Sequence, residues 1–539
     1  NCKDLFERDV LTLVNPGTVI KNEIISQHKN NFLFSVYLNK NDCSISWVDI
    51  TTGELFSKKI VGENIYEKIS DDLVKISPAE IISNKEAFDV FSISPLIEHG
   101  VLVKFSPFTE SEYNVKTATT TLKEQFGISN LQVFNINDED IVINSLGSLI
   151  SYLKLTQKHA LLNIKKVIVK SDEKVLMIDY NTVRNLEITK TIHDGKRYGS
   201  LLWLLDKTKT SMGARKLSEW LLYPLNNVND INERLDGVKA FFDNTLIRTS
   251  LIEMLSAIKD IGRISGKIAN GNLMPRDCIV LSNSLEILPN VKFNLLGLES
   301  NLIKKISNEI KDFTDVVSLL KSSINDNDTP NSLKDGGYIK DGFDKDLDEL
   351  RSINKNSKSI IAKIESRERE KTGIKNLKIA YNHVFGYYIE ITNSFKSYVP
   401  YDYKRKQTLA NCERYICDEL KEVEEKILSS EEKSLKLENE IFNKIKRFLK
   451  TKIEDFIECS NAISSLDALI SLATVAKENN YVYPTVTENE DTIELIGSRH
   501  PVVEKLSKQR FISNDCLLDG NENRTLIITG PNMAGKSTY

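Results

Sequence analysis

Two long stretches with helical spacing of apolar residues constrain the fold of this chain more than any other feature. Residues 343–371 and 419–450 both place Leu, Ile and Val at near-heptad spacing, with Lys, Arg and Glu between them. As helices rising about 1.5 Å per residue, they would each be about 45 Å long. Because a segment of different composition separates them, we expect an antiparallel pair of arms that carries a tip domain. A coiled-coil dimer is the alternative, but the interruption favours pairing within one chain.

The insert between the arms, about residues 372–418, has the pattern of strands. Residues 377–381 and 385–391 read as strands on either side of Asn382-His383. Residues 371–415 hold eight Lys/Arg against three Asp/Glu, a local charge of +5 in a chain whose net charge is −4. Basic residues interleaved with tyrosines are typical of sequence-independent contact with a phosphate backbone, although a solvated tip without a ligand is the alternative. The candidate DNA contacts are Lys404, Arg405, Lys406, Lys375, Lys378, Lys396 and Arg414.

A phosphate-binding motif lies at the C-terminal end. Residues 525–529 are apolar and β-branched, which predicts a strand, and residues 530–537 directly after them spell G-x-x-x-x-G-K-S. The glycines allow backbone N–H groups to approach phosphate oxygens, Lys536 can reach the β- and γ-phosphates, and the Ser537 hydroxyl can ligate Mg²⁺. A glycine-rich turn before an unrelated helix is the alternative. The candidate nucleotide ligands are Gly530, Pro531, Asn532, Met533, Ala534, Gly535, Lys536, Ser537 and Thr538.

Residues 18–115 are predicted to form a small α/β domain. Residues 32–37 and 44–50 alternate apolar and polar side chains around the turn at 39–42, which is a hairpin pattern. A helix is expected at 65–74, with short strands at 81–82 and 101–105. Asp49 and Glu54 could be metal-binding carboxylates of a nuclease, but no third acidic partner is evident, and capping of strands and turns is the alternative.

The remaining segments are predicted to be mostly helical. Residues 116–325 and 451–480 have apolar residues at helical spacing, with Asn229 and Asp230 as expected N-caps of one helix. Strands are expected at 493–496, 499–503 and 511–515. Phe511 could stack on an adenine or belong to a core, and His500 is expected to be structural.

Composition excludes several classes of protein. The seven cysteines are scattered without a C-x-x-C pair, which argues against a disulfide framework or a zinc site and for a reduced, intracellular protein. We find no signal peptide and no apolar run near 18 residues, so a membrane role is not expected.

Five segments together resemble the bacterial MutS family of DNA mismatch-repair ATPases, and they keep the family's order. They are Gly199–Thr210, Tyr381–Glu390, Gln407–Asn411, Arg499–Val503 and Thr529–Tyr539. The resemblance implies a multidomain α+β protein and argues against the nuclease. The implied parts are a remnant of the mismatch-recognition domain at 1–17, a ribonuclease-H-like α/β connector at 18–115, a helical core with long lever helices at 116–370 and 441–480, a small β-rich DNA clamp with its flanking arms at 371–440, and the start of a P-loop ABC-type ATPase domain at 481–539.

The resemblance also implies a function for the intact protein. It would recognise mismatched or looped double-stranded DNA and clamp on it in a cycle driven by ATP and Mg²⁺, as a bacterial cytoplasmic, nucleoid-associated homodimer that signals to a MutL-type repair protein. Phe511 would stack on adenine, Lys536 would contact the phosphates, Ser537 would ligate Mg²⁺, and Asn532 would lie near the γ-phosphate.

The sequence departs from the family pattern in three ways. The domain that senses the mismatch would precede residue 1, and the Walker B acid, signature loop and dimerising helices would follow residue 539. We therefore expect this chain to bind DNA without hydrolysing ATP. Gly262 stands where an acidic residue is expected. A MutS relative that binds recombination junctions without mismatch specificity is the alternative, although Arg8–Gly17 resembles the exit from a mismatch domain.

Overall fold

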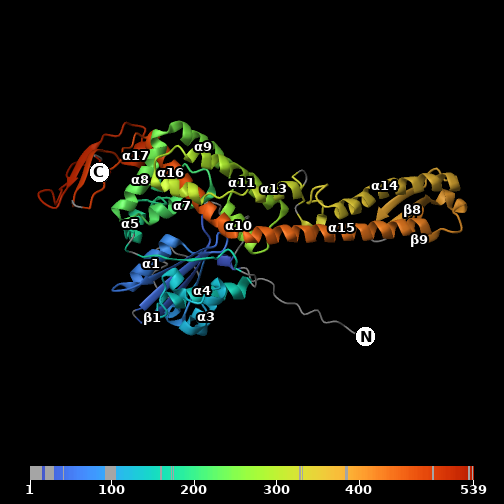
Figure 1. Ribbon diagram of the computed structural model, residues 1–539, viewed down its shortest axis with the longest axis horizontal. Helices are drawn as coiled ribbons and strands as arrows, with labels where there is room; N and C mark the ends of the chain where they lie inside the picture. The colour runs from blue at the N-terminus through green and yellow to red at the C-terminus, as the bar shows by residue number, and fades with distance from the viewer. Residues whose placement is uncertain are drawn as a thin grey trace. The chain divides into compact units, whose positions relative to one another are not determined.

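The computed structural model (Figure 1) describes most of the chain. The described residues are 15–18, 29–40, 42–91, 105–157, 161–171, 173, 175–326, 329–330, 332–382, 386–488, 491–531, 535–536 and 538–539. They belong to two units. The first consists of residues 1–273, 280–314 and 449–539, and the second of residues 274–279 and 315–448.

A six-stranded mixed sheet forms the N-terminal domain of the first unit. Its order is β5-β4-β1-β2-β3-β6, with antiparallel pairs β1–β2 and β2–β3 and parallel pairs β1–β4, β4–β5 and β3–β6. The strands are β1 (Phe32–Asn39), β2 (Asp42–Asp49), β3 (Glu54–Ile60), β4 (Glu80–Ser83), β5 (Phe105–Pro107) and β6 (Val167–Val169). The predicted hairpin is confirmed, with Asn39 paired to Asp42. Of the strand expected at 101–105, only residue 105 lies within the described residues.

Successive residues of β1 enter two different cores, as the alternation of a strand requires. Leu33 packs with α3 (Val115–Phe126) and α4 (Val142–Gln157), whereas Phe34 packs with α1 (Ile65–Ile76) and α2 (Lys85–Phe91). The structure therefore differs from the expected domain boundary at 115. Helices α3 and α4 and strand β6 belong to this domain, because the second apolar face of the sheet must be covered.

Helix α16 (Ile453–Glu478) is the centre of the helical core of the first unit. Helices α7 (Ser211–Leu222), α8 (Val228–Asp243), α10 (Ile261–Ala269) and α12 (Asn301–Glu309) all pack against it. It is the one helix of the described residues that is long and apolar enough to cross a membrane, which the sequence analysis did not anticipate. However, 72% of its apolar window is buried inside the protein, as in a core helix.

The other helices of this core are shorter or peripheral. They are α5 (Tyr180–Asn185), α6 (Leu201–Leu205), α9 (Thr245–Ala257) and α11 (Pro275–Leu295), whose first residues belong to the second unit. Helix α13 (Thr314–Ser323) belongs to the second unit except for Thr314. The N-cap of α8 is Asn227, whose side chain accepts hydrogen bonds from the backbone of Asn229 and Asp230. The N-cap therefore lies two to three residues before the expected positions, Asn229 and Asp230.

The second unit contains the predicted arms and tip. Helices α14 (Lys345–Thr372) and α15 (Asp418–Thr451) flank a four-stranded antiparallel sheet of order β7-β8-β10-β9 (Figure 1). The strands are β7 (Lys378–Asn382), β8 (Gly386–Thr392), β9 (Lys404–Thr408) and β10 (Cys412–Ile416). Arg367 pairs with Glu419 near the sheet, and Arg351 pairs with Glu438 further from it. The arms therefore run antiparallel within one chain, as predicted.

The C-terminal segment differs from the sequence prediction in two places. Strands β11 (Ile493–Ser498) and β12 (Asn514–Leu518) pair with each other, but residues 501–506 form helix α17 instead of a strand. Pro501 occupies the first turn of this helix and His500 is its N-cap, a start signal that the pattern of apolar residues obscured. Residues 525–529 form no strand, because no described strand pairs with them.

Candidate functional site

The tip sheet has an apolar core of its own. Ile389 and Ile391 of β8 are buried with Ile374, Leu377 and Leu420. Since side chains alternate along a strand, the intervening residues of β8 lie on the other face, where Glu390 is paired in register with Lys378 and Arg414. One face of the sheet therefore builds the fold and the other carries charge.

Five of the seven predicted DNA-contact residues lie within 4.0 Å of a carboxylate. The pairs are Lys404–Asp418 (2.7 Å), Lys396–Glu413 (2.7 Å), Arg405–Glu413 (3.7 Å), Lys406–Glu424 (3.8 Å) and Arg414–Glu390 (3.3 Å). Lys375 and Lys378 are exposed and have no ion pair among the residues that the structure describes. These two lysines are therefore the predicted contact residues without an ion-pair partner among the described residues.

The five ion pairs differ in how firmly they hold their cations. The Lys404 and Asp418 side chains are 71% and 74% exposed, and such pairs contribute little. Arg414 is only 17% exposed, lies 4.2 Å from the centre of the Tyr388 ring and donates to Gln407. Hydrogen bonds from Lys396 and Tyr415 hold the pKa of Glu413 below its usual range. Lys404 is thus available to a ligand, whereas Arg414 is committed to the sheet.

Glutamates of the two arms hold the tip sheet in place. Glu365 of α14 accepts a hydrogen bond from the Ile379 N–H (2.8 Å), and Glu424 of α15 accepts one from the Tyr387 N–H (3.0 Å). The Tyr403 hydroxyl donates to Glu368 over 2.7 Å, and burial together with this carboxylate raises the pKa of Tyr403. These roles could not be predicted from the sequence, because glutamates on a long charged helix look like ordinary surface residues.

The phosphate-binding motif is exposed wherever the structure describes it. Gly530 and Gly535 have φ of 153° and 89°, a region that favours glycine. The N–H groups of Thr538 and Tyr539 donate to the Gly535 carbonyl over 3.0 and 3.1 Å, which forms the beginning of a turn after exposed Lys536. Asn532, Met533, Ala534 and Ser537 lie outside the described residues, so the structure does not test their predicted roles.

Phe511 lies in the segment leading into β12 and is half-buried. The Tyr539 hydroxyl donates to the Asp515 carbonyl of β12 over 2.8 Å, which ties the end of the phosphate motif to this strand. The Gly497 N–H of β11 donates to the Asp515 carboxylate over 2.6 Å. The motif and the segment of Phe511 therefore converge on the same two-stranded ribbon.

The segment Gly199–Thr210 is held by a buried aspartate that the sequence analysis missed. Asp467 of α16 accepts hydrogen bonds from the N–H groups of Lys209 and Thr210 and from the Thr210 hydroxyl, over 2.7–3.0 Å. Burial raises the pKa of Asp467 to about 6. Thr210 in turn caps α7. A signal was present, because Asp467 is the only acidic residue between Glu458 and Glu478, in the apolar middle of α16.

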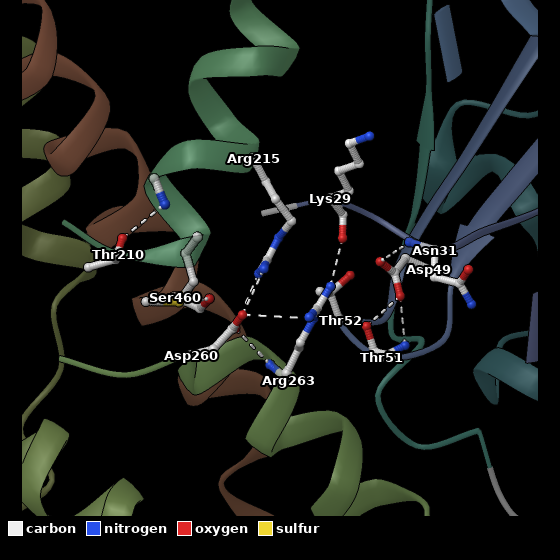
Figure 2. A network of polar contacts seen from close by, with 12 residues as sticks. Lys29, Asn31, Asp49, Thr51, Thr52, Thr210, Arg215, Asp260, Arg263 and Ser460 are labelled. Atoms are coloured by element: carbon white, nitrogen blue, oxygen red, sulfur yellow. Dashed lines mark hydrogen bonds and ion pairs between the residues drawn. The ribbon is translucent and has the colours of Figure 1, made fainter. Parts of the chain in front are cut away.

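Asp49 is the last residue of β2 and accepts hydrogen bonds at the turn that follows, as the capping alternative predicts. Asp49 is fully buried and accepts from the N–H groups of Asn31 and Thr51 and from the Thr51 hydroxyl (Figure 2). Burial raises the pKa of Glu54, which favours its neutral form. No cluster of three metal-ligating side chains occurs among the described residues. The capping alternative is therefore the better account of both carboxylates.

An ion-pair network surrounds the start of helix α10 (Figure 2). The Arg215 guanidinium donates to both carboxylate oxygens of Asp260, over 2.7 and 3.1 Å, and Arg263 donates to the Lys29 carbonyl over 2.7 Å. Burial opposes the charge on Asp260, but Arg215 beside it holds the pKa of this carboxyl below its usual range. A Cβ at position 262 would lie 2.9 Å from the Ser460 hydroxyl, so the glycine allows α10 to approach α16 closely.

The described structure is that of a multidomain α/β protein with a helical core and long helical arms that carry a small sheet. Residues 31–165 match the family model of MutS domain II, and residues 181–473 match that of MutS domain III. Since domain III alone matches more than half of the chain, the chain belongs to the MutS family.

Curated relatives resemble the chain over its whole length. Proteins named DNA mismatch repair protein MutS are 43% identical in Alkaliphilus oremlandii and 43% identical in Acetivibrio thermocellus, in each case over 100% of this chain and 61% of the relative. The protein of that name in Ruminiclostridium cellulolyticum is 42% identical, again over 100% of this chain and 61% of the relative. The chain thus spans about three fifths of the length of the curated relatives that it matches.

Proposed function

We propose that this chain is the clamping part of a DNA mismatch repair protein and that its tip sheet contacts the backbone of double-stranded DNA. The observation that carries the proposal is a pair of exposed lysines without an ion-pair partner among the described residues: Lys375, just before β7, and Lys378, the first residue of β7, at a sheet flanked by two long arms. Membership of the MutS family and the names of the relatives support it.

The contact is sequence-independent. Lysines neutralise phosphates as point charges, and no described arrangement at the tip resembles an element inserted into a groove. Lys375 and Lys378 contribute most, because neither has an ion-pair partner among the described residues. Glu390 lies opposite Lys378 in the strand register, but it is ion-paired with Arg414. Lys404, Arg405, Lys406 and Lys396 contribute less, since each must first leave a glutamate or aspartate. The exposed rings of Tyr398 and Tyr401, 63% and 107% exposed, add surface for sugar or base contact.

Salt-dependent binding to matched and mismatched duplexes tests this contact. The double variant Lys375→Ala/Lys378→Ala should weaken both complexes equally and reduce the slope of log K against log salt by about 1 per lysine. Lys59→Ala/Lys116→Ala is the matched control, because it removes the same charge from exposed positions of the N-terminal domain. Equal affinities of the two double variants would overturn the tip contact.

In the whole protein, residues 530–538 would bind ATP with Mg²⁺, with Lys536 on the phosphates, Ser537 on the metal and Phe511 against adenine. The glycine conformations and the exposure of Lys536 support this site. Titration with a fluorescent ATP analogue and Mg²⁺ tests it: Lys536→Ala should weaken binding at least tenfold. Binding unchanged by that substitution, and unchanged also by Phe511→Ala, would remove the site.

ATP would act on DNA by shifting the population of clamp positions through the lever helices. The whole protein would work as a homodimer with a MutL-type partner in the bacterial cytoplasm. Binding of recombination junctions without mismatch specificity is the alternative. Competition between a mismatched duplex and a four-way junction for the whole protein separates the two, since a junction-binding relative prefers the junction.

A further inference from the structure

A buried carboxylate far from the tip sheet joins three segments of the second unit. Glu438 of α15 is 2% exposed and accepts hydrogen bonds from the N–H groups of Gly337 (2.8 Å) and Ile339 (3.1 Å). The Arg351 guanidinium of α14 donates to the same carboxylate over 2.5 Å. A charge this deeply buried is costly unless it is fully paired, and here each oxygen has at least one donor.

The loop held by Glu438 is shaped for this contact. Gly336 and Gly337 have φ of 65° and 81°, and a Cβ at position 336 would lie 3.0 Å from a Glu438 oxygen. The backbone of Tyr338 and Lys340 bonds to Asn325 and Ser323 over 2.9 and 2.8 Å. The loop is therefore fixed to the end of α13 on one side and to α15 on the other.

Arg351 extends this junction to the first turns of α14. It donates to Asp341 over 2.6 Å as well as to Glu438. About two turns before Glu438 on α15, the Ser430 hydroxyl donates to the Leu350 carbonyl of α14 over 3.0 Å. The Glu438–Arg351 ion pair thus joins the two arms at the end away from the tip sheet. At the opposite end, Glu365 and Glu424 hold the sheet.

The two arms and the sheet form a closed frame that is fixed at both ends. At the tip, arm carboxylates bond to the backbone of β7 and β8. At the other end, the Glu438–Arg351 ion pair determines where α14 lies along α15. Buried ion pairs add little net stability, but they specify register, because a shifted arrangement would leave a buried charge unpaired. Residues 375 and 378 follow the end of α14 within six residues, so a shift of α14 along α15 would also move these two lysines.

We infer that Glu438 and Arg351 are positioning residues for DNA clamping: they set the register between the arms and so the placement of Lys375 and Lys378 on the phosphate backbone. This inference rests on the proposed tip contact. It requires that removing the ion pair weaken DNA binding through those two lysines, and not through a general loss of folded protein.

A double-mutant cycle on the 539-residue chain tests the inference. Arg351→Ala should weaken duplex binding about threefold to tenfold and lower the salt slope, as if part of the lysine contact were lost. In the Lys375→Ala/Lys378→Ala background it should have no further effect, because its targets are already gone. Arg447→Ala, which removes an exposed arginine of α15, is the matched control and should leave affinity unchanged. Arg351→Lys, which keeps a cation beside Glu438, should restore most of the affinity.

Two results would overturn the inference while leaving the tip contact intact. One is an Arg351→Ala affinity equal to that of Arg447→Ala. The other is a loss that is equally large with and without the two lysines, which is the behaviour of a purely structural residue. An unchanged affinity of Lys375→Ala/Lys378→Ala itself would instead overturn the proposed contact, and the positioning role with it.

Discussion

The tip sheet and the C-terminal segment are both small β structures, yet they differ in how their apolar residues are used. In the tip, Ile389 and Ile391 are 0% and 1% exposed in a core closed by the arms. In the C-terminal segment, Ile496, Ile512 and Ile527 are 82%, 82% and 86% exposed, and two strands pair among the residues that the structure describes there. Two strands without a packed face are marginally stable.

This difference in burial shows that a specific sequence motif and a well-packed core need not occur in the same region. The phosphate motif is the most specific pattern in the sequence, but the residues around it bury little. The tip has no comparable motif, but its strands, its core and its anchoring glutamates form a self-contained structure. The two regions of this chain therefore differ in how much apolar surface they bury, and substitutions in them should have different consequences.

The largest expected effect is the loss of a core side chain from the tip. Ile389→Ala should destabilise the tip by about 2–5 kcal/mol, because it removes buried methyl groups and leaves a cavity. Amide hydrogen exchange in β8 and β10 should accelerate accordingly. The matched substitution Ile527→Ala should change stability by less than about 0.5 kcal/mol. Equal effects at the two sites would remove the contrast between the regions.

The helical core offers a second test, based on a buried acid. Since the pKa of Asp467 is raised to about 6 in the folded state, the proton is held more tightly there than in the unfolded chain. The contribution of this group to the free energy of unfolding is therefore greatest below about pH 4 and is lost as the pH rises through about 6, by at most about 3 kcal/mol. Asp467→Asn should abolish this part of the pH dependence in thermal unfolding. A pH profile that the substitution leaves unchanged would contradict it.

Two glycines with positive φ give a smaller, paired comparison. Gly386 has φ of 70°, and a Cβ there would overlap the Glu424 carboxylate that accepts the Tyr387 N–H. Gly386→Ala should therefore cost about 2–3 kcal/mol in the tip. Gly535 has φ of 89° with nothing within 4 Å, so Gly535→Ala should cost only about 1 kcal/mol. Denaturant titration of both variants measures the difference, and the reverse order would show that Glu424 does not constrain the tip.

The smallest effect is expected at the most exposed ion pair of the tip. Lys404→Ala breaks the contact with Asp418, but both side chains are more than two thirds exposed. The melting temperature should change by no more than the equivalent of about 1 kcal/mol. DNA affinity should fall less than in Lys378→Ala, because Lys378 has no ion-pair partner among the described residues and Lys404 has one. A larger loss at Lys404 would place the main contact on β9 instead of β7.

Sequence reasoning succeeded where a local pattern is also a tertiary pattern. Heptad spacing predicted α14 and α15, and alternation predicted the β1–β2 hairpin and the first tip strands. It failed where a neighbouring segment determines whether a strand forms. Residues 525–529 are apolar and β-branched, but no described strand lies beside them. The basic run at 404–406 is part of an edge strand, which its composition did not indicate. The DNA-contact candidates stay a prediction, and spacing could not show which of them are already paired with carboxylates.

Because the two arms are antiparallel helices, the distance from the Glu438–Arg351 junction to the tip sheet can be changed by shortening both helices equally. The chain leaves through α14 and returns through α15, so seven residues removed from each helix shorten the pair by about 10 Å and turn its faces by only about 20°. Deletions on the tip side of Glu438 and Arg351 would leave that junction intact. Ligand affinity measured over a graded series of shortened arms would therefore show how far the tip must extend from the rest of the protein for binding.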